Sequence, residues 1–370
     1  MEFLVFLPNL LWPWISKVIF PHRVSVFEIL AQLVVVSVVG AAVYYGSIWA
    51  GLQDVEILNG FVTGKKKEWV SCEHSYSCNC RNECSGSGDS RSCYTVCDTC
   101  YEHTNDWDWR VNTSVTSFNI ARIDRRGSKE PPRWSKVRVN DPVSVTHSYT
   151  NYILGAPHSL FNVEESILKN YKGMVPAYPS YVYDYHYVDR VLRTSNAPNI
   201  PTKDWSLALQ SMLSPIGGTY QVNAVVIITG FDSDYAEAVR EAWKGGKKND
   251  VVVVVGANKD LQVKWVSIIS WTDAELFKVR LRDALLDLGT LEKEAFLSTL
   301  KAHIVSGFSR KSMSDFEYLK KEMKPSNTAL IMGFLLCAIL NGALTFFFLR
   351  NDFNAMTPSE LFHSIRRNFR

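Results

Sequence analysis

Two long apolar stretches interrupt an otherwise mixed chain. Residues 27–49 read FEILAQLVVVSVVGAAVYYGSIW, with Glu28 at the start as the only charge, and residues 328–349 read TALIMGFLLCAILNGALTFFFL, with no charge. A helix needs roughly 20 apolar residues to cross a hydrocarbon layer of about 30 Å. The pattern therefore predicts two transmembrane helices, over residues 27–51 and 328–349.

The segment before the first apolar stretch is also apolar and aromatic. Residues 1–26 include Pro8 and Pro13, and proline in a helix interior removes a backbone hydrogen bond and clashes with the preceding turn. We therefore expect the prolines to break any membrane-spanning helix in this segment, and we expect the segment to lie in the membrane interface.

The last segment has apolar and basic positions at helical spacing. Within residues 350–370, apolar side chains fall on one face of the predicted helix, and Arg366, Arg367 and Arg370 fall on the opposite face. A basic amphipathic helix of this kind binds an anionic membrane surface. We expect the lipid bilayer to be its partner.

Between the two predicted spans, the pattern changes three times. It divides this region into a connector (52–70), a cysteine-rich module (71–104), a strand-rich region (105–198) and an alternation of strands and helices (199–323). The strand-rich region holds two alternating segments, 109–123 and 134–154, which predict strands. The fold class predicted is α+β, with two transmembrane helices flanking a large extramembrane domain.

The alternating region has the clearest periodicity. Residues 224–229 (AVVIIT) and 251–256 (VVVVVG) are apolar throughout, as in strands that are covered on both faces. A helix opened by Asp234 and ending at Trp243 would connect them, which predicts a right-handed parallel unit. Residues 263–269 are expected to return antiparallel, so that this region forms an α/β sandwich.

Residues of about 200–320 resemble the TPM domain family. The resemblance is carried, between apolar strands, by Asp234-Tyr235-Ala236, Trp243, the Gly-Gly-Lys-Lys-Asn-Asp turn of 245–250 and Lys259-Asp260. The long helix expected at the start of the family looks shortened here to residues 206–213. The resemblance implies a membrane-tethered domain, and some relatives in that family are described as acid phosphatases or bind divalent cations.

Three carboxylates are the candidate cation ligands in this region. Asp232, Asp234 and Asp273 follow predicted strands, and open α/β sheets bind ligands at the carboxyl ends of their strands. If the TPM resemblance holds, they would bind a divalent cation through oxygen ligands. The alternative is that Asp232 and Asp234 are helix caps and that Asp273 lies in a first helical turn, where negative charge is favoured.

Seven of the eight cysteines lie in one stretch, CEHSYSCNCRNECSGSGDSRSCYTVCDTC, residues 72–100. The candidate disulfide or zinc residues are Cys72, Cys78, Cys80, Cys84, Cys93, Cys97 and Cys100, with His74 and His103 beside them. In an oxidising compartment, three disulfides would form and leave one thiol over. Alternatively, the nine side chains could fill two tetrahedral zinc sites. A third alternative is a redox pair formed by Cys97 and Cys100.

Composition and topology limit the function. The net charge of +3 is small and the basic residues are dispersed, which excludes a nucleic-acid partner. Two spans place both termini on one side, and a long loop is translocated largely regardless of its charge. We expect cytoplasmic termini and an extracytoplasmic loop, periplasmic if the protein is bacterial or phage-encoded. The cysteine-rich segment is similar to those of uncharacterised membrane proteins of large tailed phages.

The chain has no HExxH, GxSxG, P-loop or GxGxxG motif, which favours a non-catalytic protein. We predict an integral membrane protein that displays its extracytoplasmic domain for protein interaction or assembly. We expect it to be a homo-oligomer, packed through small and polar residues such as Gly40, Asn341 and Gly342. The alternatives are a membrane-tethered phosphatase or divalent-cation-binding domain of the TPM type, and a cytosolic zinc module with inverted topology.

Overall fold

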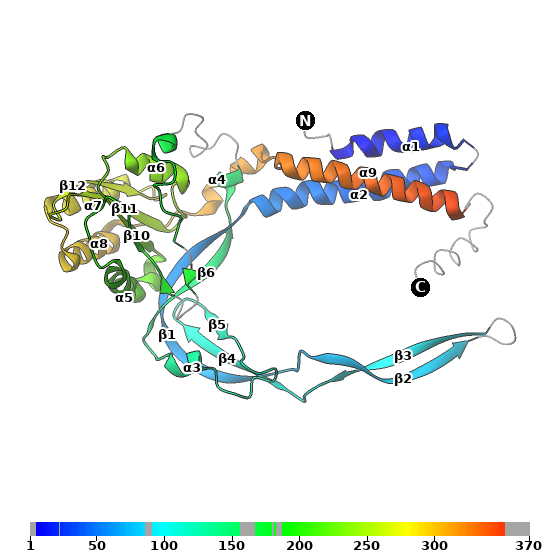
Figure 1. Ribbon diagram of the computed structural model, residues 1–370, viewed down its shortest axis with the longest axis horizontal. Helices are drawn as coiled ribbons and strands as arrows, with labels where there is room; N and C mark the ends of the chain where they lie inside the picture. The colour runs from blue at the N-terminus through cyan, green and yellow to red at the C-terminus, as the bar shows by residue number, and fades with distance from the viewer. Residues whose placement is uncertain are drawn as a thin grey trace. The chain divides into compact units, whose positions relative to one another are not determined.

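The computed structural model describes residues 5–21, 23–85, 91–155, 167–179, 181–182 and 187–351 (Figure 1). The protein is a mixed α+β protein, as its sequence predicts, and its chain divides into two compact units. The first unit comprises Met1–Asp54, Ser148–Val163 and Ser312–Arg370, and the second comprises Val55–His147 and Glu164–Lys311. The predicted tail helix with Arg366, Arg367 and Arg370 lies outside the described residues.

Two long apolar helices dominate the first unit. Helices α2 (Val26–Gly51) and α9 (Asn327–Asn351) cover both predicted spans and are long and apolar enough to cross a membrane. Only 28% of the most apolar window of each helix is buried, whereas a core helix of a soluble protein would be mostly buried. Helix α2 begins with a capping box, in which Glu28 accepts a hydrogen bond from the Ser25 N–H at 2.7 Å. The single charge of this segment therefore caps its amino end.

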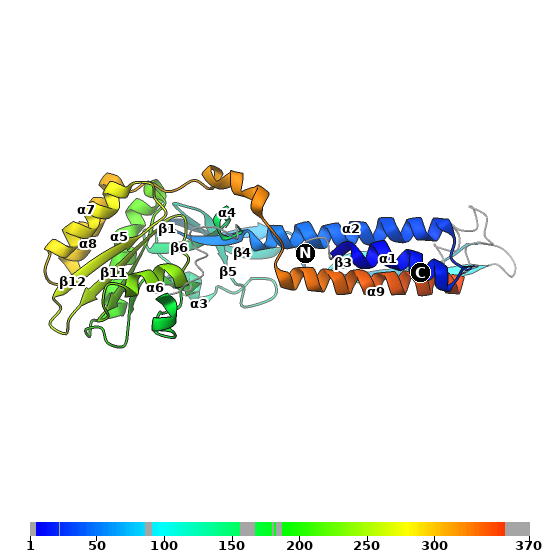
Figure 2. The same cartoon turned by 90° about the horizontal axis from the view of Figure 1, so that it is seen from above.

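The segment before α2 forms helix α1 (Leu7–Ile19), and this corrects the expected break at the prolines. Pro8 lies in the first turn, where no amide hydrogen is needed, and the helix continues through Pro13. Its 13 residues span only about 20 Å, too short to cross a bilayer. Both views show α1 alongside α2 and α9 (Figures 1 and 2). Its interfacial position stays a prediction.

Small and polar residues lie at some contacts of this helix bundle. A Cβ atom on Gly40 would lie 3.0 Å from the Phe6 ring and 3.5 Å from Cys337 Sγ, so only glycine lets the segments approach so closely there. Gly342, in contrast, has nothing within 4 Å of its would-be Cβ. Thr345 Oγ1 accepts hydrogen bonds from Gln32 at 2.8 Å and from Trp12 at 3.0 Å. These bonds connect the three helices.

Most of the first sheet belongs to the second unit, in the strand order β5-β4-β1-β6. Its strands are β1 (Gln53–Val70), β4 (Asp106–Thr113), β5 (Ser117–Ile120) and β6 (Pro142–Thr150). Trp109 of β4 and Trp134 pack edge to face over a small core. Trp134 lies in helix α3 (Pro132–Lys136), so the strand predicted over 134–154 begins only at Pro142.

Strands β2 (Ser75–Ser85) and β3 (Ser92–Tyr101) form a separate two-stranded antiparallel ribbon. Where burial is described, its residues are exposed or half-buried, so neither face packs into a core. Isolated two-stranded ribbons are marginally stable in water. Covalent links must therefore supply what a hydrophobic face does not.

The remainder of the second unit is a three-layered α/β sandwich with the strand order β12-β11-β10-β9. Its strands are β9 (Val191–Arg193), β10 (Asn223–Thr229), β11 (Asp250–Ala257) and β12 (Val263–Ile269). Its helices are α5 (Thr202–Tyr220), α6 (Tyr235–Ala242), α7 (Glu275–Asp287) and α8 (Lys293–Gly307). Alternate residues of β10 and β11 face α5, α7 and α8 on one side and α6 on the other.

The sheet confirms that β10 and β11 are parallel and that β12 is antiparallel to β11. Strands β9, β10 and β11 are parallel neighbours in chain order, but their connecting helices, α5 and α6, lie on opposite faces. The two crossovers therefore have opposite hands, and the right-handed rule holds for one of them. Helix α5 has 19 residues, so the shortened helix expected over 206–213 was wrong.

Five short elements complete the described chain: α4 (Tyr152–Gly155), η3 (Ile167–Tyr171), β7 (Tyr181–Val182), β8 (Tyr187–Val188) and η5 (Met313–Glu322). Element η5 is a 3-10 helix that is capped by Ser312, whose hydroxyl oxygen accepts a hydrogen bond from the Ser314 N–H at 3.3 Å. It precedes α9 in the first unit.

Candidate metal centre

Six of the seven clustered cysteines pair across the ribbon. The disulfides are Cys78–Cys100, Cys80–Cys97 and Cys84–Cys93. The three-bridge alternative is therefore the one that the structure contains. Cys97 and Cys100 each bond to a cysteine of the other strand, so they do not form a redox pair, and two four-ligand zinc sites lack the sulfurs that they would need.

The bridges explain how an exposed ribbon holds its shape. They close loops with sequence separations of 9, 17 and 22 residues, each of which restricts the unfolded chain. A disulfide typically contributes about 2–4 kcal/mol. The bridges thus stand in for the missing hydrophobic core of the ribbon.

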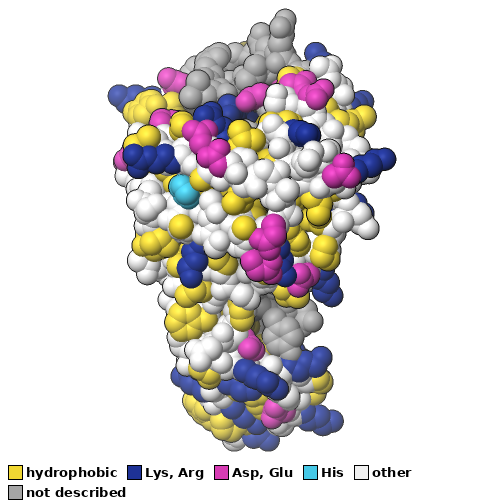
Figure 3. All heavy atoms as spheres, turned by 90° about the vertical axis from the view of Figure 1, so that its left-hand side faces the viewer, with side chains coloured by type: hydrophobic (Ala, Val, Ile, Leu, Met, Phe, Trp, Pro, Cys, Tyr) yellow, Lys and Arg dark blue, Asp and Glu magenta, His cyan; other side chains and the backbone are white. Residues whose placement is uncertain are grey.

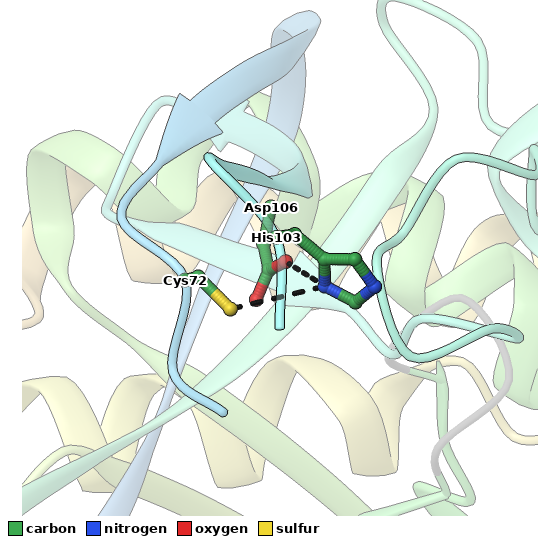
Figure 4. A group of neighbouring side chains, drawn as sticks. All are labelled: Cys72, His103 and Asp106. Atoms are coloured by element: carbon green, nitrogen blue, oxygen red, sulfur yellow. Dashed lines mark hydrogen bonds and ion pairs between the residues drawn. The ribbon is translucent and has the colours of Figure 1, made fainter. Parts of the chain in front are cut away.

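Cys72 is the cysteine left over, and it lies outside the ribbon, between β1 and β2. It is buried, and its Sγ lies 3.8 Å from Nδ1 of His103. The same Nδ1 lies 3.1 Å from Oδ1 of Asp106, the first residue of β4. Figure 4 shows the three side chains converging, with the Nδ1 edge of the imidazole turned toward the other two.

Backbone pairing brings these residues together. The register of β1 with β4 ends at Val70 and Asp106, two residues from Cys72. Across the base of the ribbon, the Glu102 N–H donates to the His74 carbonyl oxygen at 3.0 Å. Cys72 and His103 are therefore held at adjoining ends of paired strands.

Asp106 is an ionised, fully buried ligand candidate. Burial opposes its ionisation, but the Glu73 N–H donates to it at 3.2 Å and the Arg122 guanidinium donates to Oδ2 at 3.2 Å. Together with His103, these groups hold the pKa of Asp106 below its usual value. Because Arg122 binds Oδ2, Oδ1 is the oxygen that faces His103.

The geometry fits a metal better than a catalytic triad. In a Cys-His-Asp relay, the thiol and the carboxylate contact different imidazole nitrogens, whereas here both approach Nδ1 of His103. In a tetrahedral zinc site, sulfur and nitrogen ligands lie about 3.6 Å apart, and nitrogen and oxygen ligands about 3.3 Å apart, as the bond lengths require. The observed 3.8 and 3.1 Å are close to these values.

Three such ligands would leave a fourth position open. The donor atoms of Cys72, His103 and Asp106 all lie within 4.8 Å of one another, and His103 is partly exposed. A thiolate, an imidazole and a carboxylate together suit Zn²⁺. Sequence reasoning included Cys72 and His103 but missed Asp106, although its position three residues after His103 was a signal.

His74 does not join this group. Its backbone oxygen lies 3.6 Å from Cys72 Sγ, but its ring is not among the converging donors. Of the two flanking histidines that the sequence predicts as ligands, only His103 is therefore placed to bind the same ion as Cys72.

The three aspartates of the α/β sandwich are not brought together. Asp232 and Asp234 follow the carboxyl end of β10, whereas Asp273 follows β12, which runs antiparallel to β11. Asp273 therefore lies at the opposite end of the strands from Asp232 and Asp234, and one ion cannot bind all three aspartates. Asp234 accepts a hydrogen bond from the Tyr171 hydroxyl at 2.6 Å and does not cap α6, and Asp273 forms an ion pair with Lys311.

No protein-family model, curated protein or solved structure matches this chain. The resemblance to the TPM family therefore stays an expectation from the sequence.

Proposed function

We propose that this protein is anchored in a membrane by α2 and α9 and displays the chain between them on the extracytoplasmic side, where it binds or assembles with other proteins. The observation that carries this proposal is the set of three disulfides in the ribbon of β2 and β3. Disulfides persist in oxidising compartments and are rare in the cytosol. The ribbon lies in the chain between the two apolar helices.

The exposed surface of the ribbon favours binding over catalysis. Tyr76, Tyr94 and Tyr101 are each between 44% and 58% exposed, although tyrosine is large and partly apolar. Aromatic side chains are enriched where proteins contact one another. A rigid, disulfide-linked strand pair that carries them offers a preorganised contact surface.

Lysine labelling tests the topology. A membrane-impermeant amine reagent added to intact cells is expected to label Lys259 and Lys301, which lie in the displayed loop, and to spare Lys17 of α1. All three are expected to react after the membrane is dissolved, which controls for reactivity. Labelling of Lys17 alone in intact cells would show the inverted topology and overturn the proposal.

A second proposed function is the binding of one zinc ion by Cys72, His103 and Asp106. The distances at Nδ1 of His103 favour it. Binding would release a proton from the thiol, because the thiolate is the ligand. The ion would connect the end of β1 to the start of β4 at the base of the ribbon.

Cobalt substitution tests this second function. Co²⁺ added to the purified, full-length protein is expected to give a thiolate charge-transfer band that saturates at one equivalent and disappears on adding Zn²⁺. Cys72→Ser is expected to weaken binding by at least about tenfold. Cys337→Ser, which removes the other free thiol, is the matched control. A band that survives in Cys72→Ser would exclude this site.

A further inference from the structure

One edge of the α/β sandwich carries a groove beside an open strand. The groove has a volume of about 340 Å³, and β12 residues Trp265, Val266, Ser267 and Ile268 form part of its lining. Helix α6 lines one side and helix α7 lines the other. The groove therefore runs along the strand between two helices that lie on opposite faces of the sheet.

Strand β12 has a neighbour on one side only. It pairs with β11, and among the described residues it ends the order of its sheet. Its first residue is covered, since the Val263 N–H donates to the Gly289 carbonyl oxygen at 2.9 Å. The stretch from Trp265 to Ile269 has no second strand beside it in the described chain. An edge of this kind can pair with an added strand.

This edge is held rigidly. Val266 and Ile268 are buried in the core beneath α7 and α8, and the Trp265 indole donates to the Phe231 carbonyl oxygen at 3.0 Å. A strand fixed from both faces needs little ordering when a partner pairs with it, so less conformational entropy is lost on binding.

The groove is predominantly basic. Arg240 of α6 and both Lys278 and Arg282 of α7 line it, with Glu237 as the only acidic residue in its lining. Figure 3 views the side on which β12 and α7 lie in Figure 1 and shows basic and acidic side chains interspersed over it. The lining itself has an excess of two positive charges.

Each of these cations already has a carboxylate neighbour in its own helix. Arg240 pairs with Glu237 at 3.3 Å, Lys278 with Glu275, and Arg282 with Asp283 at 2.7 Å. The three carboxylate side chains are at least half exposed, and such pairs contribute about 0–1 kcal/mol each. A carboxylate from a ligand can therefore compete for the cations.

The charges disfavour pairing between two copies of this edge. If two β12 strands met antiparallel across a two-fold axis, each basic lining would face the other. Lys264, exposed at the start of the same edge, would add to this repulsion. Complementary charge is found instead in a peptide with acidic side chains.

We propose that an extended, acidic segment of a partner protein adds to the sheet as a strand along Trp265–Ile269, with its carboxylates contacting Arg240, Lys278 and Arg282. Backbone hydrogen bonds would give affinity, and the basic helices on either side would select acidic side chains. This inference deepens the proposed function, on which it rests, by naming the class of partner.

Fluorescence anisotropy tests the proposal with the full-length protein in detergent. The probe is a labelled peptide of about ten residues in which Glu-Glu pairs alternate with Val-Thr pairs, so that an added strand presents carboxylates to both faces of the sheet. This length covers the open edge. We expect saturable binding that weakens as salt is added. The same peptide with Lys in place of Glu, or with N-methyl groups on alternate amides, is expected to bind at least about tenfold more weakly.

Variants locate the binding site. Arg282→Glu and Lys278→Glu are each expected to raise the Kd by about tenfold, and Lys301→Glu, an exposed charge change on α8 away from the groove, by less than about twofold. Amide exchange at Trp265–Ile269 is expected to slow when the peptide binds. Folding of each variant is checked by its thermal unfolding midpoint.

Three results would overturn this inference: no binding at about 1 mM peptide, equal binding of the N-methylated peptide, or a dimer in sedimentation that Lys278→Glu abolishes or strengthens. The last result would identify a second copy of the chain as the occupant. The measurement uses solubilised protein and does not depend on membrane topology, so its failure is distinguishable from failure of the lysine-labelling test.

Discussion

Asn223 Nδ2 donates a hydrogen bond of 2.8 Å to Oδ1 of Asp250, where the parallel strands β10 and β11 begin. The amide oxygen of Asn223 accepts a second hydrogen bond, of 2.7 Å, from Arg190. Asp250 and Arg190 are both fully buried, so one amide connects opposite charges inside the second unit. Arg190 also donates to Asn59 of β1 and Ser144 of β6, which ties the first sheet to the α/β sandwich.

Asp250 gives the fold a defined pH dependence. Burial raises its pKa to about 6, although hydrogen bonds from Asn223, the Lys247 N–H and Tyr178 oppose this shift. The folded state therefore binds a proton between about pH 4 and pH 6 that the unfolded chain has released, and this group's contribution to stability falls as the pH rises through that window. The protein is expected to gain roughly 1 kcal/mol from it at pH 5 relative to pH 7.

Unfolding of the full-length protein in detergent at the two pH values checks this expectation. Asp250→Asn is expected to lose that component of the pH dependence, while Asp260→Asn, in an exposed turn, retains it. A pH dependence that is identical in wild type and Asp250→Asn would assign it to other groups.

Glu56 is a buried carboxylate surrounded by three basic side chains. It is fully buried, lies 2.9 Å from His147 and 3.3 Å from Lys248, and forms an ion pair with Arg310. Glu56→Gln removes the negative charge that stabilises Lys248 and Arg310, and we expect it to cost about 2–3 kcal/mol. Chemical denaturation measures the loss, and Glu294→Gln, at an exposed surface pair, is expected to change stability by less than about 0.5 kcal/mol.

Two adjacent glycines of α5 offer a matched pair of substitutions. A Cβ on Gly217 would lie 2.1 Å from the Asn59 carbonyl oxygen of β1, whereas one on Gly218 would come no closer than 3.9 Å to its nearest neighbour. Gly217→Ala is expected to destabilise the protein by at least about 2 kcal/mol, because the backbone of α5 or of β1 must move to make room for the added methyl group. Gly218→Ala is expected to be neutral or to stabilise by up to about 1 kcal/mol. Equal effects in thermal unfolding would contradict the close approach of α5 to β1.

The three disulfides predict how many cysteines react with an alkylating reagent before and after reduction. Under denaturing, non-reducing conditions an alkylating reagent is expected to modify two cysteines per chain, Cys72 and Cys337, and after reduction all eight. Peptide mapping by mass spectrometry identifies the bridged pairs. Eight reactive thiols without reduction would point to a metal-bound, cytosolic module instead.

Features that depend on neighbours along the chain were readable from the sequence. The apolar runs that become α2, α9, β10 and β11 were located almost to the residue. Helices apolar enough to cross a membrane and strands covered on both faces are both continuously hydrophobic. Counting the clustered cysteines also gave three bridges and one odd thiol as one of three alternatives, and the structure contains that alternative. The continuation of α1 through Pro13 did not, because packing against two neighbouring helices outweighs the local cost of a proline.

Features that depend on pairing between distant segments were decided by the tertiary structure. The pairing of the six bridged cysteines rests on an irregular register between Cys78 and Arg81, where Asn79 has a φ of 48°, and no composition rule places such a bulge. Because β12 is antiparallel, Asp273 lies at the opposite end of the strands from Asp232 and Asp234. The pairing of strand ends likewise places Asp106 beside Cys72 and His103. The hydrophobicity of each segment can be read directly from its own residues. The position of a site depends instead on strand register and strand direction, which only the folded chain determines.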